Sequence, residues 1–140
     1  MAGGLYTYGM LEFTLPVIIA DTTLLFVRAV LVIVFTYEAW FKLRDIRKFA
    51  KNDGLPVLVA YFVAFAELAA ALAMFTGVLT QWAGVGIMLL MVITICFHIF
   101  KWHSPYWASK KGWEYDFLLF VFAMVVVSFG AGSITLLNLL

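Results

Sequence analysis

Residues 57–79 read VLVAYFVAFAELAAALAMFTGVL, an apolar stretch in which Glu67 is the only charged residue. A helix that crosses the hydrocarbon core of a bilayer needs about 20 such residues, because the core is about 30 Å thick and a helix rises about 1.5 Å per residue. The stretch therefore predicts a transmembrane helix, and this prediction decides the class of protein to which the 140-residue chain belongs.

Three further stretches have the same character, at residues 22–41, 83–100 and 117–139. The first contains Arg28 and Glu38, whereas the other two contain no Asp, Glu, Lys or Arg. No stretch shows the alternating pattern of a strand, and helices are the usual way for an apolar chain to satisfy its backbone in lipid. We therefore expect an all-α integral membrane protein, built as a four-helix bundle.

The composition supports this class. The chain is 66% hydrophobic and 12% charged, with a mean hydropathy of +1.06, whereas a soluble domain carries about 25% charged residues. The net charge is only +1 and no basic stretch dominates, which excludes nucleic acid as a partner and leaves the lipid bilayer as the expected surroundings. Cys96 is the only cysteine and so excludes an intramolecular disulfide.

The basic residues set the expected topology. Eight of the nine Lys and Arg residues fall between the first and second spans or between the third and fourth: Lys42, Arg44, Arg47, Lys48, Lys51, Lys101, Lys110 and Lys111. Positive residues concentrate in cytoplasmic loops. We therefore expect both basic loops in the cytoplasm, both termini on the outer side, and the chain in the cytoplasmic (inner) membrane.

The chain before the first span is less apolar. Residues 1–21 contain Glu12 and Pro16, and we expect them to form an interfacial segment in front of a membrane domain at residues 22–140. Asp21 or Thr22 is expected to cap the first transmembrane helix.

Two local patterns lie in and beside the second span. Ile46, Phe49 and Ala50 recur at helical spacing among basic residues, which predicts a short amphipathic helix on the inner surface. Small residues recur in the second span, at Ala66, Ala70, Ala73 and Gly77. This spacing predicts a face on which another helix approaches closely.

Ionisable groups inside a bilayer cost free energy and persist where they pair, line water or perform a task. From the helix rise, Arg28 and Glu67 lie within reach of one another near the middle of the membrane, and we expect them to pair. Such a pair either fixes the register of two helices or takes part in function.

A second group of polar residues comes to one level near the inner face. Glu38, His98 and Glu114 lie at about 24 Å from the outer face, with Asp116 beside them, and we expect an inner polar cluster. In the alternative interpretation, Glu38 reaches the headgroups and His98 is a hydrogen-bonded packing residue. One histidine in a span cannot hold a haem between two histidines, and no metal-binding or nucleophile motif is present. We expect no metal and no catalytic residue in this chain.

The order of several short motifs resembles the DoxX family of small four-helix membrane proteins. Those motifs, spread over residues 24–136, are Arg28 with Phe35 and Lys42, Gly54-Leu-Pro56, Ala64-Phe-Ala-Glu67-Leu68, Gly77-Val-Leu-Thr80, His98, Gly112-Trp-Glu114 and Gly130-Ala131-Gly132-Ser133. The chain departs from the family pattern at Glu38-Ala39, where the family has His-Gly, and at the closing motif, which lacks its proline and has Asn138 near the place of an acidic residue.

The resemblance implies a link to respiratory and quinone-dependent oxidoreductase complexes, including thiosulfate:quinone oxidoreductase. We expect an accessory or anchor subunit with other membrane subunits as partners, no cofactor bound by the chain alone, and a quinone site beside Glu38, His98 and Glu114. Two alternatives remain. One is a non-catalytic assembly or stabilising factor, and the other is a small proton-coupled transporter that uses Glu67, against which the strong charge bias of the loops argues.

Overall fold

The computed structural model of the protein describes residues 5–107 and 112–139, and this part of the chain contains helices and no strand. The elements are α1 (Leu5–Arg44), α2 (Ile46–Asp53), α3 (Val57–Thr76), α4 (Thr80–Cys96), the π-helix η1 (Phe97–Lys101), α5 (Glu114–Phe129) and α6 (Leu136–Leu139). The all-α prediction is confirmed for the described residues.

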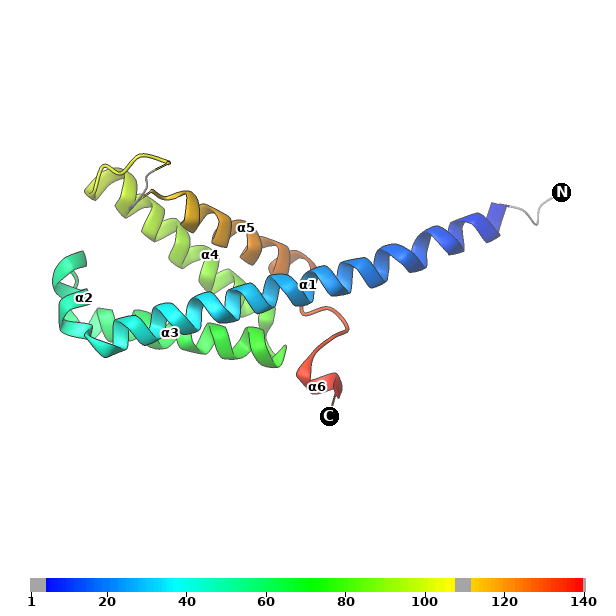
Figure 1. Cartoon of the computed structure of the whole chain (residues 1–140), viewed down its shortest axis with the longest axis horizontal. Helices are drawn as coiled ribbons and strands as arrows, with labels where there is room; N and C mark the ends of the chain where they lie inside the picture. Colours follow the sequence, from blue (N-terminus) through cyan, green and yellow to red (C-terminus); the bar gives the residue numbers. More distant parts are fainter. Residues whose placement is uncertain (1–4, 108–111, 140) are drawn as a thin grey trace.

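The long helices form two neighbouring pairs, α1 with α3 and α4 with α5 (Figure 1). The pairs meet near the middle of the molecule and diverge toward the end that carries α2 and η1, which we call the inner end. The first part of α1 extends beyond the other helices on the opposite side. The inner end is therefore where a space between the two pairs can open.

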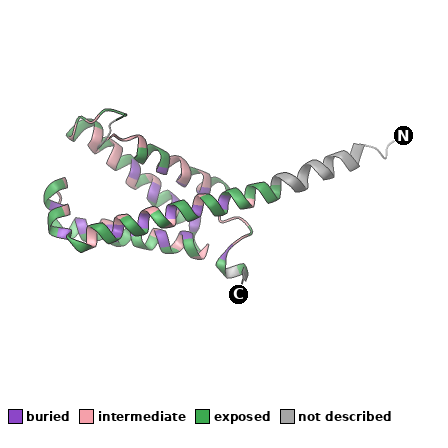
Figure 2. Ribbon diagram, viewed as in Figure 1, coloured by how far each residue is buried: buried purple, intermediate pink, exposed green. Residues whose placement is uncertain are grey.

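Within residues 5–107 and 112–139, three helical segments are long and apolar enough to cross a membrane: Val17–Arg44 in α1, Val57–Thr76, which is α3, and Thr80–Lys101, which joins α4 and η1. They correspond to the first three predicted spans. Much of the surface of these helices is exposed (Figure 2). Large apolar side chains that are exposed and do not line the cavity described below include Ile33, Phe65 and Val92. These side chains are suited to contact lipid chains.

The fourth predicted span, 117–139, is shorter in the structure. α5 ends at Phe129 after 16 residues, about 24 Å of helix against about 30 Å of hydrocarbon core. Gly130 follows with φ 75° and ψ −153°, a backbone conformation that is essentially restricted to glycine, and the chain turns away. The residues after Gly130 carry no charge and are rich in Leu and Ile, so hydropathy did not reveal this end. Four helices pack together, but within the described residues only three have the length of a span.

The start of the first predicted span also differs. α1 runs through residue 21 without a break, so the predicted helix start at Asp21 or Thr22 is wrong. Thr22 and Thr23 donate their hydroxyl hydrogens to the carbonyls of Ile18 and Ile19 at 2.8 Å, as threonines do inside a helix. Asp21 accepts hydrogen bonds from Ser133 instead.

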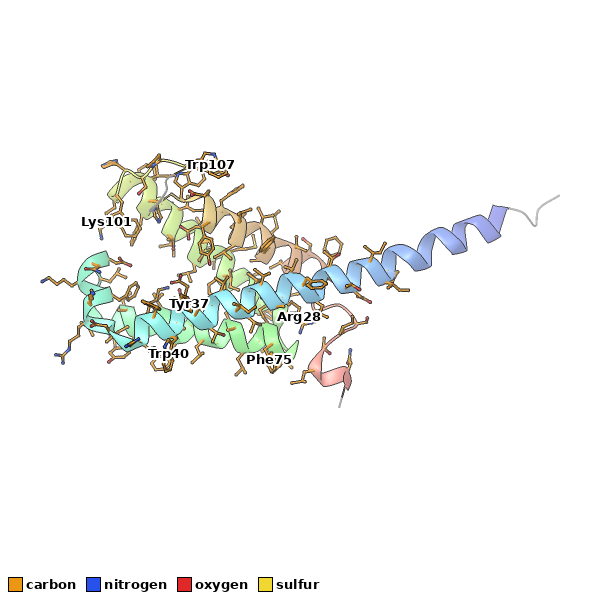
Figure 3. The ribbon with its side chains drawn as sticks, in the orientation of Figure 1. Arg28, Tyr37, Trp40, Phe75, Lys101 and Trp107 are labelled. Atoms are coloured by element: carbon orange, nitrogen blue, oxygen red, sulfur yellow. The ribbon has the colours of Figure 1, made fainter. Side chains whose placement is uncertain are left out.

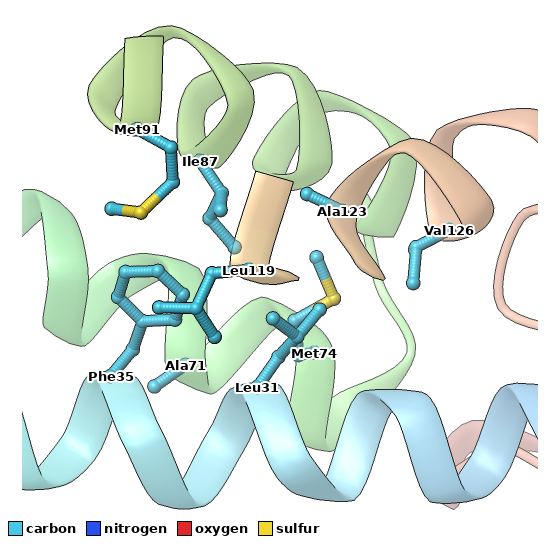
Figure 4. Packing of buried hydrophobic residues seen from close by; sticks show 9 residues of the cluster. All are labelled: Leu31, Phe35, Ala71, Met74, Ile87, Met91, Leu119, Ala123 and Val126. Atoms are coloured by element: carbon cyan, nitrogen blue, oxygen red, sulfur yellow. The ribbon is translucent and has the colours of Figure 1, made fainter. Parts of the chain in front are cut away.

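The core is formed by all four long helices. Its buried residues are Leu31, Phe35, Ala71, Met74, Ile87, Met91, Leu119, Ala123 and Val126 (Figure 4). Phe35 and Leu31 of α1 lie against side chains of α3, α4 and α5, so this cluster joins the two helix pairs. Burial of these side chains holds the pairs together at the point from which they diverge.

The predicted amphipathic helix is present as α2. The Asp45 carboxylate accepts the backbone N–H of Lys48 at 3.2 Å at its start, and Gly54 with φ 64° ends it in the left-handed conformation. Ile46 and Ala50 are buried against Ala60 and Ala64 of α3 in a second small core. α2 is thereby fixed across the inner end of the α1–α3 pair.

Candidate functional site

A cavity of roughly 1520 Å³ lies between the diverging helix pairs and is lined by residues of α1 to α5. Its walls are largely apolar and rich in aromatic rings, including Phe35, Phe62, Phe97 and Trp102. Pockets of about 300–1,000 Å³ bind drug-sized molecules, so this cavity is large enough for a bulky amphipathic ligand.

Three charged side chains of α1 and α3 meet on one wall of the cavity. Lys42 Nζ donates a hydrogen bond to Glu67 Oε1, and it lies 3.6 Å from Glu38 Oε2. The Glu67 side chain is 2% exposed, that of Lys42 17% and that of Glu38 42%. Glu67 Oε2 has no hydrogen-bond partner among the described residues. The deepest carboxylate therefore shares one cation with a carboxylate that is open to solvent.

On the opposite wall, η1 and α5 bring His98 to Asp116. His98 Nε2 lies 3.4 Å from Asp116 Oδ2, and the indole of Trp102 stands edge-on to the imidazole with ring centroids 4.7 Å apart. His98 Nδ1 is buried without a hydrogen-bond partner in the described part of the chain. Burial raises the pKa of the Asp116 carboxyl group, which lies outside the three apolar spans, and the charge of His98 opposes this rise.

The two walls are electrostatically connected. The negative charge of Glu38 raises the pKa of the Asp116 carboxyl group and the positive charge of Lys42 lowers it, so the groups from α1 act on the carboxyl group of α5. We call Glu38, Lys42, Glu67, His98 and Asp116 the polar centre of the cavity. An apolar cavity with a hydrogen-bonding and proton-exchanging centre can orient an amphipathic ligand and stabilise charge on it.

A hydrogen bond joins η1 to α2 at the inner end, beside the cavity. Lys101 of η1 donates a hydrogen bond from Nζ to the backbone carbonyl of Asp53, the last residue of α2, and its Nζ lies 5.1 Å from the centroid of the Phe97 ring (Figure 3). A cation near the carboxyl end of a helix is favoured by the helix dipole. This contact ties η1 to α2.

The structure brings together two of the three residues predicted for the inner cluster. Glu38 and His98 line the same cavity, whereas Glu114 is not among the residues that line it. Residues two positions apart on a helix point about 200° apart, so α5 turns Asp116 toward the cavity and Glu114 elsewhere. Asp116 stood at the same predicted depth, and Lys42 follows Glu38 by one helical turn. The depth of Asp116 and the spacing of Lys42 could be read from the sequence, but neither was enough to include these two residues in the predicted cluster.

The predicted pair of Arg28 and Glu67 is not formed. Arg28 is buried and donates hydrogen bonds to the carbonyls of Met74 at 2.9 Å, Ala131 at 2.9 Å, Ile134 at 2.8 Å and Phe75 at 3.4 Å (Figure 3). α1 and α3 run in opposite directions, so Arg28 faces the last turn of α3, where carbonyls are free, and the long side chain of Lys42 reaches Glu67. The two predicted partners therefore lie in separate places: Arg28 binds carbonyls at the end of α3, and Glu67 pairs with Lys42 nearer the inner end.

Among the described residues, no three His, Cys, Asp or Glu side chains converge as a metal site would require. No curated protein and no solved structure matches the chain significantly. The sequence model of the DoxX family matches residues 23–101, which is more than half of the chain and includes every residue of the polar centre except Asp116. The matched part covers α1 from residue 23, α2, α3, α4 and η1. This protein therefore belongs to the DoxX family.

Proposed function

We propose that this protein is an accessory membrane subunit of a quinone-linked oxidoreductase complex, and that its cavity receives the quinone. The observation that carries the proposal is an apolar cavity of roughly 1520 Å³ that contains a histidine–carboxylate pair, His98 and Asp116. A quinone has a long apolar tail and a ring with two carbonyl oxygens. It therefore needs an apolar channel with a hydrogen-bonding group at its polar end.

The imidazole of His98 is suited to this polar end. Its Nδ1 is buried without a hydrogen-bond partner in the described part of the chain, and Asp116 holds the other ring nitrogen. A ring nitrogen held in this way can donate a hydrogen bond to a quinone oxygen or accept one from a quinol. The chain supplies binding and orientation in this proposal, and the electrons pass through redox groups of partner subunits.

The first experiment is isolation of the protein from native membranes in mild detergent, with identification of every chain that accompanies it. Stoichiometric recovery with haem, copper or flavin subunits supports the proposal. Recovery only as a homo-oligomer overturns the subunit role. Substoichiometric recovery with immature subunits favours an assembly factor instead.

The site is tested in the isolated complex by His98→Ala, with His103→Ala as the matched control. His103 is the second histidine of the chain and does not line the cavity. We expect quinone-dependent turnover to fall roughly tenfold or more in His98→Ala, because a buried hydrogen bond to the ring is lost, and to stay unchanged in His103→Ala. Unchanged turnover in both variants rejects the site.

A further inference from the structure

The polar centre carries more negative than positive charge. Three carboxylates, those of Glu38, Glu67 and Asp116, face one lysine, Lys42, and a histidine. With all carboxylates ionised, the excess is two negative charges when His98 is neutral and one when it is protonated. The phenol of Tyr115 also lines this part of the cavity and adds no charge near neutral pH.

The charges at the mouth do not correct this excess. Arg44 of α1 and Lys48 of α2 are matched there by two acidic residues, Asp45 and Asp53. Lys101 of η1 does not line the cavity, and its ammonium group is held at the backbone carbonyl of Asp53. The other described residues that line the cavity carry no positive charge at neutral pH, apart from what His98 contributes. The excess therefore belongs to the polar centre itself.

The excess negative charge costs the most free energy at Glu67, because this carboxylate is the most deeply buried of the three. Its side chain is 2% exposed, and Oε2 is buried without a hydrogen-bond partner among the described residues while Oε1 is held by Lys42. Lys42 offsets the charge of Glu67 only in part, because the same ammonium group also lies 3.6 Å from Glu38 Oε2. Charge that is left unpaired in an apolar environment costs several kcal/mol in general, so these two carboxylates together attract a proton or a further cation. A vacant carboxylate oxygen in the cavity wall is the feature that a positively charged ligand requires.

The walls of the cavity indicate which kind of cation fits. Phe35, Phe41, Phe49 and Phe62 line the cavity together with Trp102, and aromatic faces attract organic cations. A small hydrated ion would lose its water in these surroundings without gaining a set of oxygen ligands. A molecule with an apolar, aromatic-sized body and one positive charge matches both the walls and the charge.

We propose that the cavity binds an amphipathic organic cation, with the positive charge of the ligand placed at Glu67. In the absence of the ligand, a proton on a carboxyl group of the polar centre offsets part of the excess charge. Binding of the cation breaks that O–H bond and releases the proton to solvent, so one positive charge replaces another. This inference goes beyond the quinone proposal, which concerns His98 and Asp116.

The test uses the full chain in nanodiscs of zwitterionic lipid, with radiolabelled methyltriphenylphosphonium as the probe. Its neutral isostere, triphenylphosphine oxide, is the matched control ligand. We expect saturable binding of the cation that an excess of the neutral compound does not displace. The apparent Kd should rise by up to tenfold for each unit by which the pH falls, because one proton competes with one cation.

Two variants locate the charge that is recognised. Glu67→Gln should weaken binding of the cation roughly tenfold or more, because the carboxylate charge is lost from a site of low dielectric. Asp21→Asn removes one carboxylate at the opposite end of the molecule and should leave the Kd unchanged. The amide oxygen can still accept the backbone N–H of Ser133, and the amide N–H group can donate to the Ser133 hydroxyl oxygen.

Three results overturn the inference: displacement of the cation by an excess of the neutral isostere, an affinity that does not change with pH, or a folded Glu67→Gln variant that binds as the natural protein does. If Glu67→Gln does not fold, two measurements on the natural protein still test the inference. They are the competition between the cation and its neutral isostere, and the dependence of the Kd on pH. The His98→Ala variant separates the two proposals, because two properties are measured on it. Loss of quinone-dependent turnover tests the quinone proposal, and binding of the cation is measured separately and tests the present inference.

Discussion

Lys42 is the residue on which the buried charges of the α1–α3 pair depend. Its ammonium group contacts both Glu67 and Glu38, and its Nζ also lies 5.3 Å from the centroid of the Phe49 ring. At the opposite end of the α1–α3 pair, Arg28 has no carboxylate partner among the described residues and donates its hydrogen bonds to backbone carbonyls of α3 and of the chain after α5. A buried cation can thus serve as a pair partner or as a cap for the end of a helix.

The dependence of Glu67 on Lys42 predicts a particular pattern of stability. Lys42→Met leaves a buried carboxylate without its cation and should lower the free energy of unfolding by about 3–5 kcal/mol. The double variant Lys42→Met with Glu67→Met replaces the pair by apolar side chains and should recover most of this loss. Unfolding of the single and double variants in detergent micelles measures the coupling between the two sites, and a double variant no more stable than Lys42→Met would contradict the pairing.

At the scale of the elements, the two faces of α3 have other contacts than the sequence predicted. The buried face that packs on α1 and α2 carries Ala60, Ala64 and Ala71, whereas the row of small residues that predicted close helix contact, including Ala66 and Ala70, lines the cavity. Small side chains on that face leave volume for a ligand. The close helix contact occurs between α4 and α5 instead, at Gly84, where a Cβ atom would lie 2.7 Å from Val127 Cγ2.

This contact predicts different effects for two glycines of the same helix. Gly84→Ala should destabilise the protein by about 1–3 kcal/mol, because the added methyl group collides with Val127 and comes within 3.3 Å of the Ala123 carbonyl. Gly86→Ala should be neutral or slightly stabilising, since nothing lies within 4 Å of its Cβ position and alanine favours the helix. Thermal unfolding in one detergent compares the two variants, and equal destabilisation would mean that α4 and α5 do not pack closely at Gly84.

At the scale of the whole molecule, the positive charges gather at one end. The basic residues of α2 and Lys101 of η1 lie at the inner end, together with the mouth of the cavity (Figures 1 and 3). The turn between α3 and α4 lies at the other end of α3 and carries no Lys or Arg. This arrangement is the one that the positive-inside rule requires if the inner end faces the cytoplasm.

The orientation is measured with single cysteines in a Cys96→Ser background. We expect Lys51→Cys in α2 to react with a membrane-impermeant maleimide in inside-out vesicles only, and Val78→Cys in the α3–α4 turn to react in intact cells. The opposite pattern would reverse the topology. Labelling of both cysteines from both sides would indicate insertion in two orientations and would favour the transporter alternative.

The sequence by itself determined the helical class and the first three membrane spans. These properties are local, because the thickness of the bilayer and the cost of unpaired backbone groups act on each apolar stretch separately. The DoxX assignment rests on the same part of the chain, since the family model ends at residue 101.

Only the tertiary structure decided which polar residues meet. The partner of Glu67 depends on the antiparallel register of α1 and α3, which aligns it with Lys42 and places Arg28 at free carbonyls. The choice of Asp116 over Glu114 depends on the rotation of α5 about its axis, and the end of α5 depends on a glycine backbone conformation that hydropathy does not report. Pairing of the polar side chains is therefore set by helix register and rotation, which are properties of the packed helices and not of any single stretch.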